Sequence, residues 1–269
     1  MSLRKQIKGR IPEPIWRVAR DSWIALRHAS AWPLATFHPW RRASIHMLAD
    51  LKGSQRGKRA FVLGNGPSLA RTEVSKLQGE YTFGLNRIYL AFPDWGFSTN
   101  YFVCVNDLVI AQFAQDIAAL KMPKFLSWRS RRFLKPDDHT AFLNSTYERP
   151  VFARDARGRL WEGATVTYVA LQLAFHMGFD PVILIGVDHT FAAKGVPNTT
   201  VVSEGEDASH FDPRYFGSGY RWQLPDLEMS EHAYRMARRA YQAAGRQVLD
   251  ATVDGKLTVF PKVEYNSLF

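Results

Sequence analysis

The stretch "FVLGNGPSL" (Phe61–Leu69) joins three apolar residues to a turn made of two glycines, an asparagine, a proline and a serine. Gly64 and Gly66 can adopt positive φ and can approach a neighbouring backbone or a ligand closely. The proline and serine that follow are typical of a helix start, whose backbone amides favour an anion such as phosphate. The spacing is neither G-x-x-x-x-G-K-[ST] nor G-x-G-x-x-G, because leucine stands at the third glycine position. Two interpretations stay open here, a structural turn and a phosphate cradle.

Around this stretch, short apolar runs alternate with helical patterns. Strands are predicted over Ala60–Gly64, Tyr81–Asn86, Asn100–Asp107, Pro123–Trp128 and Pro181–Asp188. Helices are predicted near Leu69–Leu77, over Leu108–Leu120 and over Gly163–Gly178. Strands this apolar are expected in a parallel sheet that is covered on both faces by crossover helices. The sequence therefore predicts a three-layer α/β fold with a mostly parallel sheet, whose strand order the pattern leaves open.

Polar side chains stand where several of these strands end. Asn65, Asn86 and Asn106 follow three successive predicted strands, and Asp188 ends the most apolar one. Ligands of open α/β sheets bind at the carboxyl ends of the strands, so these residues are expected to cluster. An asparagine amide offers both a donor and an acceptor, which suits a ribose, a base edge or a phosphate. We therefore expect a nucleotide site there, although a lone strand-end asparagine is more often a turn former.

The net charge of +10 lies entirely near the N-terminus. Residues 1–60 hold thirteen Lys and Arg against three acids, and the rest of the chain is balanced. Four tryptophans lie in the same segment: Trp16, Trp23, Trp32 and Trp40. We interpret residues 1–57 as a basic helical arm, and 58–269 as the catalytic domain. The arm suits an anionic membrane surface, or it packs on the body; nucleic acid is not an expected partner.

The single cysteine, Cys104, excludes a disulfide framework and points to a reducing compartment. The first thirty residues lack the apolar core of a signal peptide, and no run of eighteen apolar residues occurs. We expect a cytoplasmic protein, peripheral on the inner membrane face if the arm binds lipid. Homo-oligomerisation is left open.

A long polar segment, Ala192–Leu227, contains five aromatic residues and is predicted to be an acceptor-binding lid, with a purely structural excursion as the alternative. His189 and His210 are the candidate general bases, because the imidazole pKa lies near neutrality. Asp188 is a candidate for orienting a histidine or the donor sugar. Either histidine could instead be an ordinary hydrogen-bonding residue.

Basic side chains that could hold phosphate follow the fourth predicted strand. Arg129, Arg131 and Arg132 in "SWRSRR" could clamp a phosphate bidentately, or they could form a solvated loop. The sequence contains no D-x-D, no H-E-x-x-H and no Cys/His cluster. We therefore expect no metal cofactor, and stabilisation of the leaving phosphate by amides, arginine or tyrosine.

The segments "LGNGPSL", "GLNRIY", "VNDL", "GATVTYVALQLAFHMGF" and "VILIGVDHTF" resemble, in this order, the MptE-like Rossmann domain family. Its namesake is an archaeal 6-hydroxymethylpterin diphosphokinase, and the family is related to flagellin-modifying motility accessory factors. The same landmarks are similar to those of bacterial lipooligosaccharide sialyltransferases, which use CMP-sialic acid without a metal. The resemblance covers roughly residues 58–269 and implies a Rossmann-like fold.

The resemblance also implies roles for individual residues. The residues expected to contact nucleotide phosphate, ribose or donor sugar are Gly64, Asn65, Gly66, Ser68, Asn86, Asn106, Thr165 and Thr167. Thr165 matches a threonine near the cytidine in the sialyltransferases, but the Ser-Gly that follows it there is Val166-Thr167 in this chain. Thr190 stands where they have a phosphate-binding tyrosine. In "SHFDPRYF", His210 matches the first histidine of their "SHY" motif, and Arg214 falls near their catalytic base. Arg214 and Tyr215 join Arg129 and Arg131 as the phosphate or acceptor candidates.

Three functions follow as hypotheses. The first is a metal-independent glycosyltransferase, sialyltransferase-like, which moves a CMP- or other nucleotide-activated sugar to a cell-surface glycan or lipid-linked acceptor. The second is a Mg²⁺-dependent ATP diphosphokinase of the pterin type. The third is a nucleotide- or glycan-binding module without catalysis, which would need the polar strand ends but neither His189 nor His210.

Overall fold

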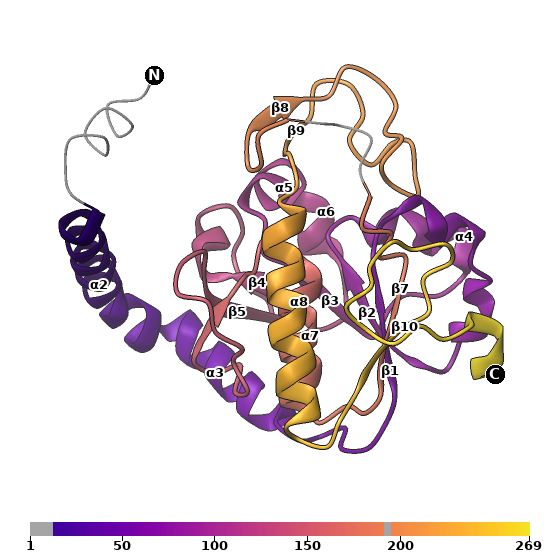
Figure 1. Cartoon of the computed structure of the whole chain (residues 1–269), viewed down its shortest axis with the longest axis horizontal. Helices are drawn as coiled ribbons and strands as arrows, with labels where there is room; N and C mark the ends of the chain where they lie inside the picture. The colour runs from indigo at the N-terminus through magenta and orange to yellow at the C-terminus, as the bar shows by residue number, and fades with distance from the viewer. Residues whose placement is uncertain (1–12, 191–194) are drawn as a thin grey trace.

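A computed structural model of the chain describes residues 13–190 and 195–269. It confirms the α/β prediction: eight strands form one sheet in the order β10-β7-β1-β2-β3-β4-β5-β6, and every neighbouring pair is parallel (Figure 1). The strands are β1 (Ala60–Leu63), β2 (Tyr81–Leu85), β3 (Tyr101–Cys104), β4 (Lys124–Ser127), β5 (Thr140–Thr146), β6 (Arg159–Trp161), β7 (Val182–Ile185) and β10 (Val248–Asp250). From β1 the chain adds β2 to β6 one after another on one side of that strand. It then crosses to the other side of β1, where β7 and β10 lie. The strand order therefore reverses between β1 and β7, where ligand crevices form in such sheets.

Helices cover both faces of the sheet, as the sequence predicts. The α-helices are α2 (Glu13–Phe37), α3 (Pro39–Leu51), α4 (Phe92–Trp95), α5 (Asp107–Gln112), α6 (Ala114–Ala119), α7 (Val166–Met177) and α8 (Leu227–Gln242). The 3₁₀ turns are η1 (Pro67–Arg71), η2 (Val74–Leu77), η3 (Ile88–Ala91), η4 (Trp128–Arg132) and η5 (Tyr265–Leu268). Successive β1 residues divide between the two layers, because strand side chains alternate. Val62 packs with α7 and α8 on one face, and Phe61 packs with α5 and α6 on the other.

Several predicted elements are shorter than expected or divided. The helix predicted near Leu69–Leu77 consists of the separate turns η1 and η2, and the helix predicted over Leu108–Leu120 is interrupted at Phe113 into α5 and α6. The buried helix α7 agrees with the prediction and ends at Gly178, which takes the left-handed conformation with φ 94°. The structure also contains elements that the sequence pattern did not predict: strands β5, β6 and β10 and the long helix α8.

The predicted arm divides into two parts. Helix α2 extends away from the sheet, whereas α3 lies across the end of the sheet near β5 (Figure 1). Ser44 on α3 accepts a hydrogen bond from the Phe142 amide at 2.9 Å, and Leu48 is fully buried. Residues 39–57 therefore pack on the α/β body, and the boundary at residue 57 stays a prediction. The arm residues 1–12 lie outside the described residues.

The segment predicted as a lid forms an excursion above the sheet (Figure 1). It contains a two-stranded antiparallel sheet of β8 (Thr200–Val202) and β9 (Arg221–Gln223), and residues 192–194 of it lie outside the described residues. Gln112 at the end of α5 holds this hairpin: its amide accepts from the Arg221 N–H and donates to the Arg221 carbonyl, both at 2.8 Å. The excursion thus lies over the carboxyl ends of the central strands.

Candidate functional site

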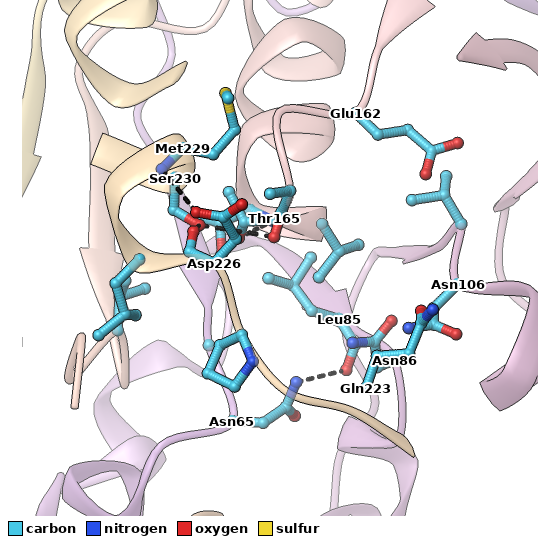
Figure 2. A pocket seen from close by; sticks show the side chains of 18 of the residues that line it. Asn65, Leu85, Asn86, Asn106, Glu162, Thr165, Gln223, Asp226, Met229 and Ser230 are labelled. Carbon is cyan, nitrogen blue, oxygen red and sulfur yellow. Dashed lines mark hydrogen bonds between the residues drawn. The ribbon is translucent and has the colours of Figure 1, made fainter. Parts of the chain in front are cut away.

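A cavity of about 1060 Å³ lies beneath this excursion. Its walls come from the ends of β1, β2, β3 and β7, from the starts of α7 and α8, and from the lid segment. Figure 2 shows Asn65, Asn86 and Asn106 gathered in one part of the cavity, with Thr165, Asp226 and Ser230 grouped apart from them. This volume is large enough to hold a nucleotide with an attached sugar, because the pockets of small-molecule ligands span several hundred to about a thousand cubic ångströms.

The three strand-end asparagines converge as the sequence predicts. Asn65 donates from Nδ2 to the Leu85 carbonyl at 3.0 Å, and Asn106 caps α5 by accepting from the Leu108 amide at 2.9 Å. Asn86 takes a left-handed backbone conformation with φ 49°. The Oδ1 atoms of Asn65 and Asn86 are buried and make no hydrogen bond within the part of the chain that the structure describes. Buried acceptors without partners are costly, so these two atoms suit a ligand that donates hydrogen bonds.

The glycine turn is explained by close packing against the end of β7. A Cβ added at Gly64 would overlap the Gly186 carbonyl, and one at Gly66 would overlap the Asp188 carboxylate. Ser68 donates to Asp188 twice, from its amide at 3.1 Å and from its hydroxyl at 2.7 Å. The carboxylate of Asp188 thus occupies the anion position at the start of η1.

Ser68 is fully buried and bonded to Asp188, and its contact with a nucleotide phosphate stays a prediction. Asp188 borders the cavity, and its carboxylate accepts both hydrogen bonds from Ser68. Its role in orienting a histidine or the donor sugar stays a prediction as well. Gly64 and Gly66 do line the cavity, and their contact with a nucleotide stays a prediction.

Thr165 and Thr167 both line the cavity at the start of α7. The Thr165 hydroxyl caps the helix by accepting from the Thr167 amide at 3.3 Å, and it lies 3.2 Å from the Tyr234 hydroxyl. Ala164, which precedes the cap, has φ 59°. The turn thus presents the helix N-terminus to the cavity.

Both candidate histidines line the cavity, and each has a carboxylate partner. His210 Nδ1 lies 2.7 Å from Asp207 Oδ2, and its ring stacks on Tyr215 with centroids 3.9 Å apart and planes at 5°. His189 Nε2 lies 3.2 Å from Glu231 Oε1. In each pair the carboxylate fixes which ring nitrogen carries the proton, and the other nitrogen is then an acceptor.

Tyr215, predicted as a phosphate or acceptor residue, is buried and lines the cavity. Burial raises the pKa of its hydroxyl, which therefore stays protonated. Arg87 holds this part of the lid: its guanidinium donates to the backbone carbonyls of Arg214 and Tyr215 and lies 3.7 Å from the Phe113 ring centroid. The sequence offered no reason to select Arg87, since its partners are some 127 residues away.

The arginines predicted to hold phosphate lie elsewhere. Arg129 is ion-paired with Asp107 at 3.0 Å and with Glu162 at 2.6 Å, and Arg131 lies beside it outside the cavity. Arg214 is exposed and pairs with Asp212. The structure thus places Arg129, Arg131 and Arg214 outside the lining of the main cavity.

Glu162 and Arg149 also line the cavity, and no sequence motif marks either residue. Burial raises the pKa of the Glu162 carboxyl, and the charge of Arg129 opposes this shift. Arg149 is the one Arg or Lys among the described residues that line the cavity. Nothing in the local sequence distinguishes it.

Unusual backbone conformations concentrate at the same place. Among the described residues, six other than glycine have positive φ, and five of them line the cavity: Asn86, Arg149, Ala164, His189 and Asn198. Such conformations cost about 1–3 kcal/mol each and cluster at functional sites. No group of three or more His, Cys, Asp or Glu side chains that could hold a metal ion is found in residues 13–190 and 195–269.

The fold and the cavity define a Rossmann-like α/β domain with a polar site at its topological switch point. Residues 40–194, more than half of the chain, match the family described as 6-hydroxymethylpterin diphosphokinase MptE-like, and the chain belongs to this family. No curated protein matches the sequence.

The fold is similar to that of the MAf glycosyltransferase from Magnetospirillum magneticum AMB-1, with a TM-score of 0.51 and 14% identity. The alignment covers 86% of this chain and 39% of that one. At this identity the likeness concerns the fold alone.

Proposed function

We propose that this chain is a glycosyltransferase that moves a sugar from a nucleotide-activated donor to an acceptor hydroxyl without a metal ion. The observation that carries the proposal is the convergence of Asn65, Asn86 and Asn106 on one cavity that also contains His189 and His210. The two unpartnered Oδ1 atoms would accept from ribose or base groups. The fold likeness to a glycosyltransferase supports the same class of reaction.

In this proposal His210 acts as the general base. With Nδ1 held by Asp207, the neutral ring accepts the acceptor's hydroxyl proton at Nε2. The acceptor oxygen then forms a bond to the anomeric carbon, while the bond from that carbon to the phosphate oxygen breaks. The electron pair of the broken bond leaves with the nucleotide. His189, paired with Glu231, is the second candidate for the same role.

The charge of the cavity supports one class of donor. Arg149 is the one cationic Lys or Arg side chain among its described lining residues, whereas five carboxylates line it: Asp21, Glu148, Glu162, Asp188 and Asp226. Two adjacent phosphates would need more cationic partners than one phosphate does. This balance favours a nucleoside monophosphate sugar, such as a CMP-sugar. The acceptor class proposed is a glycan or glycolipid, with the basic N-terminal segment working at an anionic membrane surface.

Thermal-shift measurements with CMP, CDP, UDP, GDP and ATP, each with and without Mg²⁺, test the proposal. A ligand that binds only the native state raises the Tm, so CMP is expected to stabilise the protein without metal. Stabilisation by ATP only with Mg²⁺ would instead support the diphosphokinase chemistry that the family's description names. Transfer that EDTA abolishes and Mg²⁺ restores would defeat the metal-independent mechanism.

The variant Asn106→Asp tests in this assay whether the Asn106 side chain contacts the nucleotide. An aspartate keeps the Oδ1 atom that caps α5, but it removes the amide donor and adds a negative charge beside the donor phosphate. We expect an unchanged Tm without ligand and a lost CMP response. Asn266→Asp is the matched control, because Asn266 is exposed and its Oδ1 accepts from Lys76. An unchanged CMP response in Asn106→Asp would remove Asn106 from the site.

A further inference from the structure

A second cavity, of about 380 Å³, lies between the start of α3 and the turn η4. It is lined by His38, Trp40, Arg129, Arg131 and Arg132, and we call it the basic cleft. Its aromatic wall is ordered by ring contacts: the His38 ring lies 5.2 Å from Trp40 and 5.1 Å from Trp128, both edge-on. The basic cleft shares none of its lining residues with the main cavity.

The cleft carries surplus positive charge. Arg129 is neutralised by Asp107 and Glu162, so it contributes little to an incoming anion. Arg131 lies over the Trp128 ring at 4.3 Å and makes no ion pair with any carboxylate of the described chain. The Arg132 side chain is 62% exposed and lies 3.6 Å from Asp107. Burial and the charge of Arg132 both lower the pKa of Arg131, so these two guanidinium groups repel each other and an anion between them would relieve the repulsion.

An exposed apolar helix face leads to the cleft. Ile15, Val18, Leu26, Leu34 and Phe37 are each between 53% and 70% exposed. At 3.6 residues per turn these five positions lie within one side of α2. Helix α2 ends at Phe37, beside His38 of the cleft, and Ala35 in its last turn is buried against the body. The C-terminal end of this apolar face is therefore next to the basic cleft along the chain.

An anionic membrane is the occupant that fits both parts. Basic amphipathic helices lie in the interface with their apolar side chains in the acyl boundary, while Lys and Arg attract acidic headgroups. The first sixty residues carry thirteen Lys and Arg against three acids, which disfavours the pairing of two like-charged copies. No helix in the described residues is long and apolar enough to span a bilayer.

We propose that α2 lies in the surface of an anionic membrane and that Arg131 and Arg132 bind a lipid headgroup phosphate in the basic cleft. The proposal rests on the membrane association included in the proposed function, but not on the donor or the reaction. Tryptophan and arginine side by side suit the headgroup region, where the ring is half in lipid and the guanidinium binds phosphate.

Vesicle co-sedimentation of the full chain tests this site. The wild type is expected to bind vesicles of phosphatidylcholine with phosphatidylglycerol, and not vesicles of phosphatidylcholine alone. Arg131→Gln/Arg132→Gln is expected to weaken binding by roughly 25-fold, since one basic residue contributes about 1 kcal/mol, a factor of about five, near such a surface. Lys121→Gln/Arg239→Gln removes two exposed charges elsewhere and should leave binding nearly unchanged.

The helix face is tested separately with Leu26→Asp/Phe37→Asp, which should abolish binding. Equal vesicle binding by Arg131→Gln/Arg132→Gln and by its control variant would overturn the headgroup site. Failure of the wild type to bind anionic vesicles would overturn the membrane proposal. If the wild type instead dimerises in solution and Leu26→Asp/Phe37→Asp makes it monomeric, the face binds a second copy. The CMP thermal shift of each variant should equal that of the wild type, which separates this test from failure of the proposed function.

Discussion

Ser68 donates two hydrogen bonds to Asp188, one from its amide and one from its hydroxyl, across 120 residues of chain. This pair joins the turn after β1 to the turn after β7 at the point where the strand order reverses. A protein carboxylate thus stands where a phosphate would bind in other glycine-rich turns. The turn thus shapes the wall of the cavity, which Gly64, Asn65 and Gly66 line.

Ser68→Ala is expected to lower the free energy of unfolding by about 1–3 kcal/mol, because it leaves a carboxylate oxygen of Asp188 without its donor. Chemical denaturation measures the change. Ser75→Ala, at an exposed position in η2, is the control and should stay near the wild type. If both variants unfold at the same denaturant concentration, the Ser68–Asp188 pair contributes nothing to stability.

Much of the fold could be predicted because β1 to β4 and β7 are short apolar runs that ended in polar residues. The convergence of Asn65, Asn86 and Asn106 followed from one rule about parallel sheets. Strands β6 and β10 were not predicted, because each is three residues long. A strand of that length is too short to show a recognisable hydrophobic pattern.

The ion pairs of Arg129 could not be predicted from the sequence, for a different reason. A basic residue after a strand is a reasonable phosphate ligand until Asp107 and Glu162, from two other elements, are placed beside it. Such long-range partners depend on strand order, which the sequence pattern does not contain. The pairing of Ser68 with Asp188 could not be predicted for the same reason.

The lid is held to the body by Gln112, so Gln112→Ala should loosen it. Losing both hydrogen bonds to Arg221 is expected to speed proteolytic cleavage within residues 195–226 several-fold with little change in Tm, because local opening needs fewer broken contacts than global unfolding. Limited proteolysis followed by mass spectrometry gives the cleavage sites. Gln115→Ala, exposed on α6, is the matched control, and equal cleavage rates in the two variants would contradict the anchor.

Stability should fall on mild acidification because of His176. Burial lowers the pKa of this imidazole from its ordinary 6.5, and the hydrogen bond from Nε2 to the Leu48 carbonyl at 2.7 Å opposes the shift only in part. Nδ1 accepts from the Ala156 amide at 3.2 Å, so the ring is held in its neutral form. The unfolded chain therefore takes up a proton first as pH falls below 6.5, and the native state loses stability there.

The test compares the Tm of wild type and His176→Gln between pH 7.5 and 5. The variant cannot titrate at this position, so its Tm should vary less across the window. Asp137 and Asp155 have pKa values below their ordinary 3.8, held down chiefly by Lys124 and Arg157, and their stabilising effect is lost only at lower pH. Parallel Tm curves for the two proteins would exclude His176 as the sensitive group.

Asp207 is expected to be a positioning residue for the proposed base. Its Oδ2 accepts from His210 Nδ1 at 2.7 Å, and its Oδ1 accepts from the Ser209 amide at 2.8 Å. In Asp207→Asn the amide presents a donor to Nδ1 and favours the tautomer whose proton sits on Nε2, the wrong nitrogen for accepting one. By analogy with the serine protease triad, kcat should fall on the order of 10²- to 10⁴-fold.

Nucleotide binding separates this effect from a structural one. CMP does not require the His210 tautomer, so the Kd of CMP in Asp207→Asn should match the wild type while kcat falls. Glu206→Gln, next to it but exposed, should preserve both. A joint loss of CMP affinity and Tm would mean that Asp207 supports the lid rather than the base, and full activity would shift the catalytic role to His189 and Glu231.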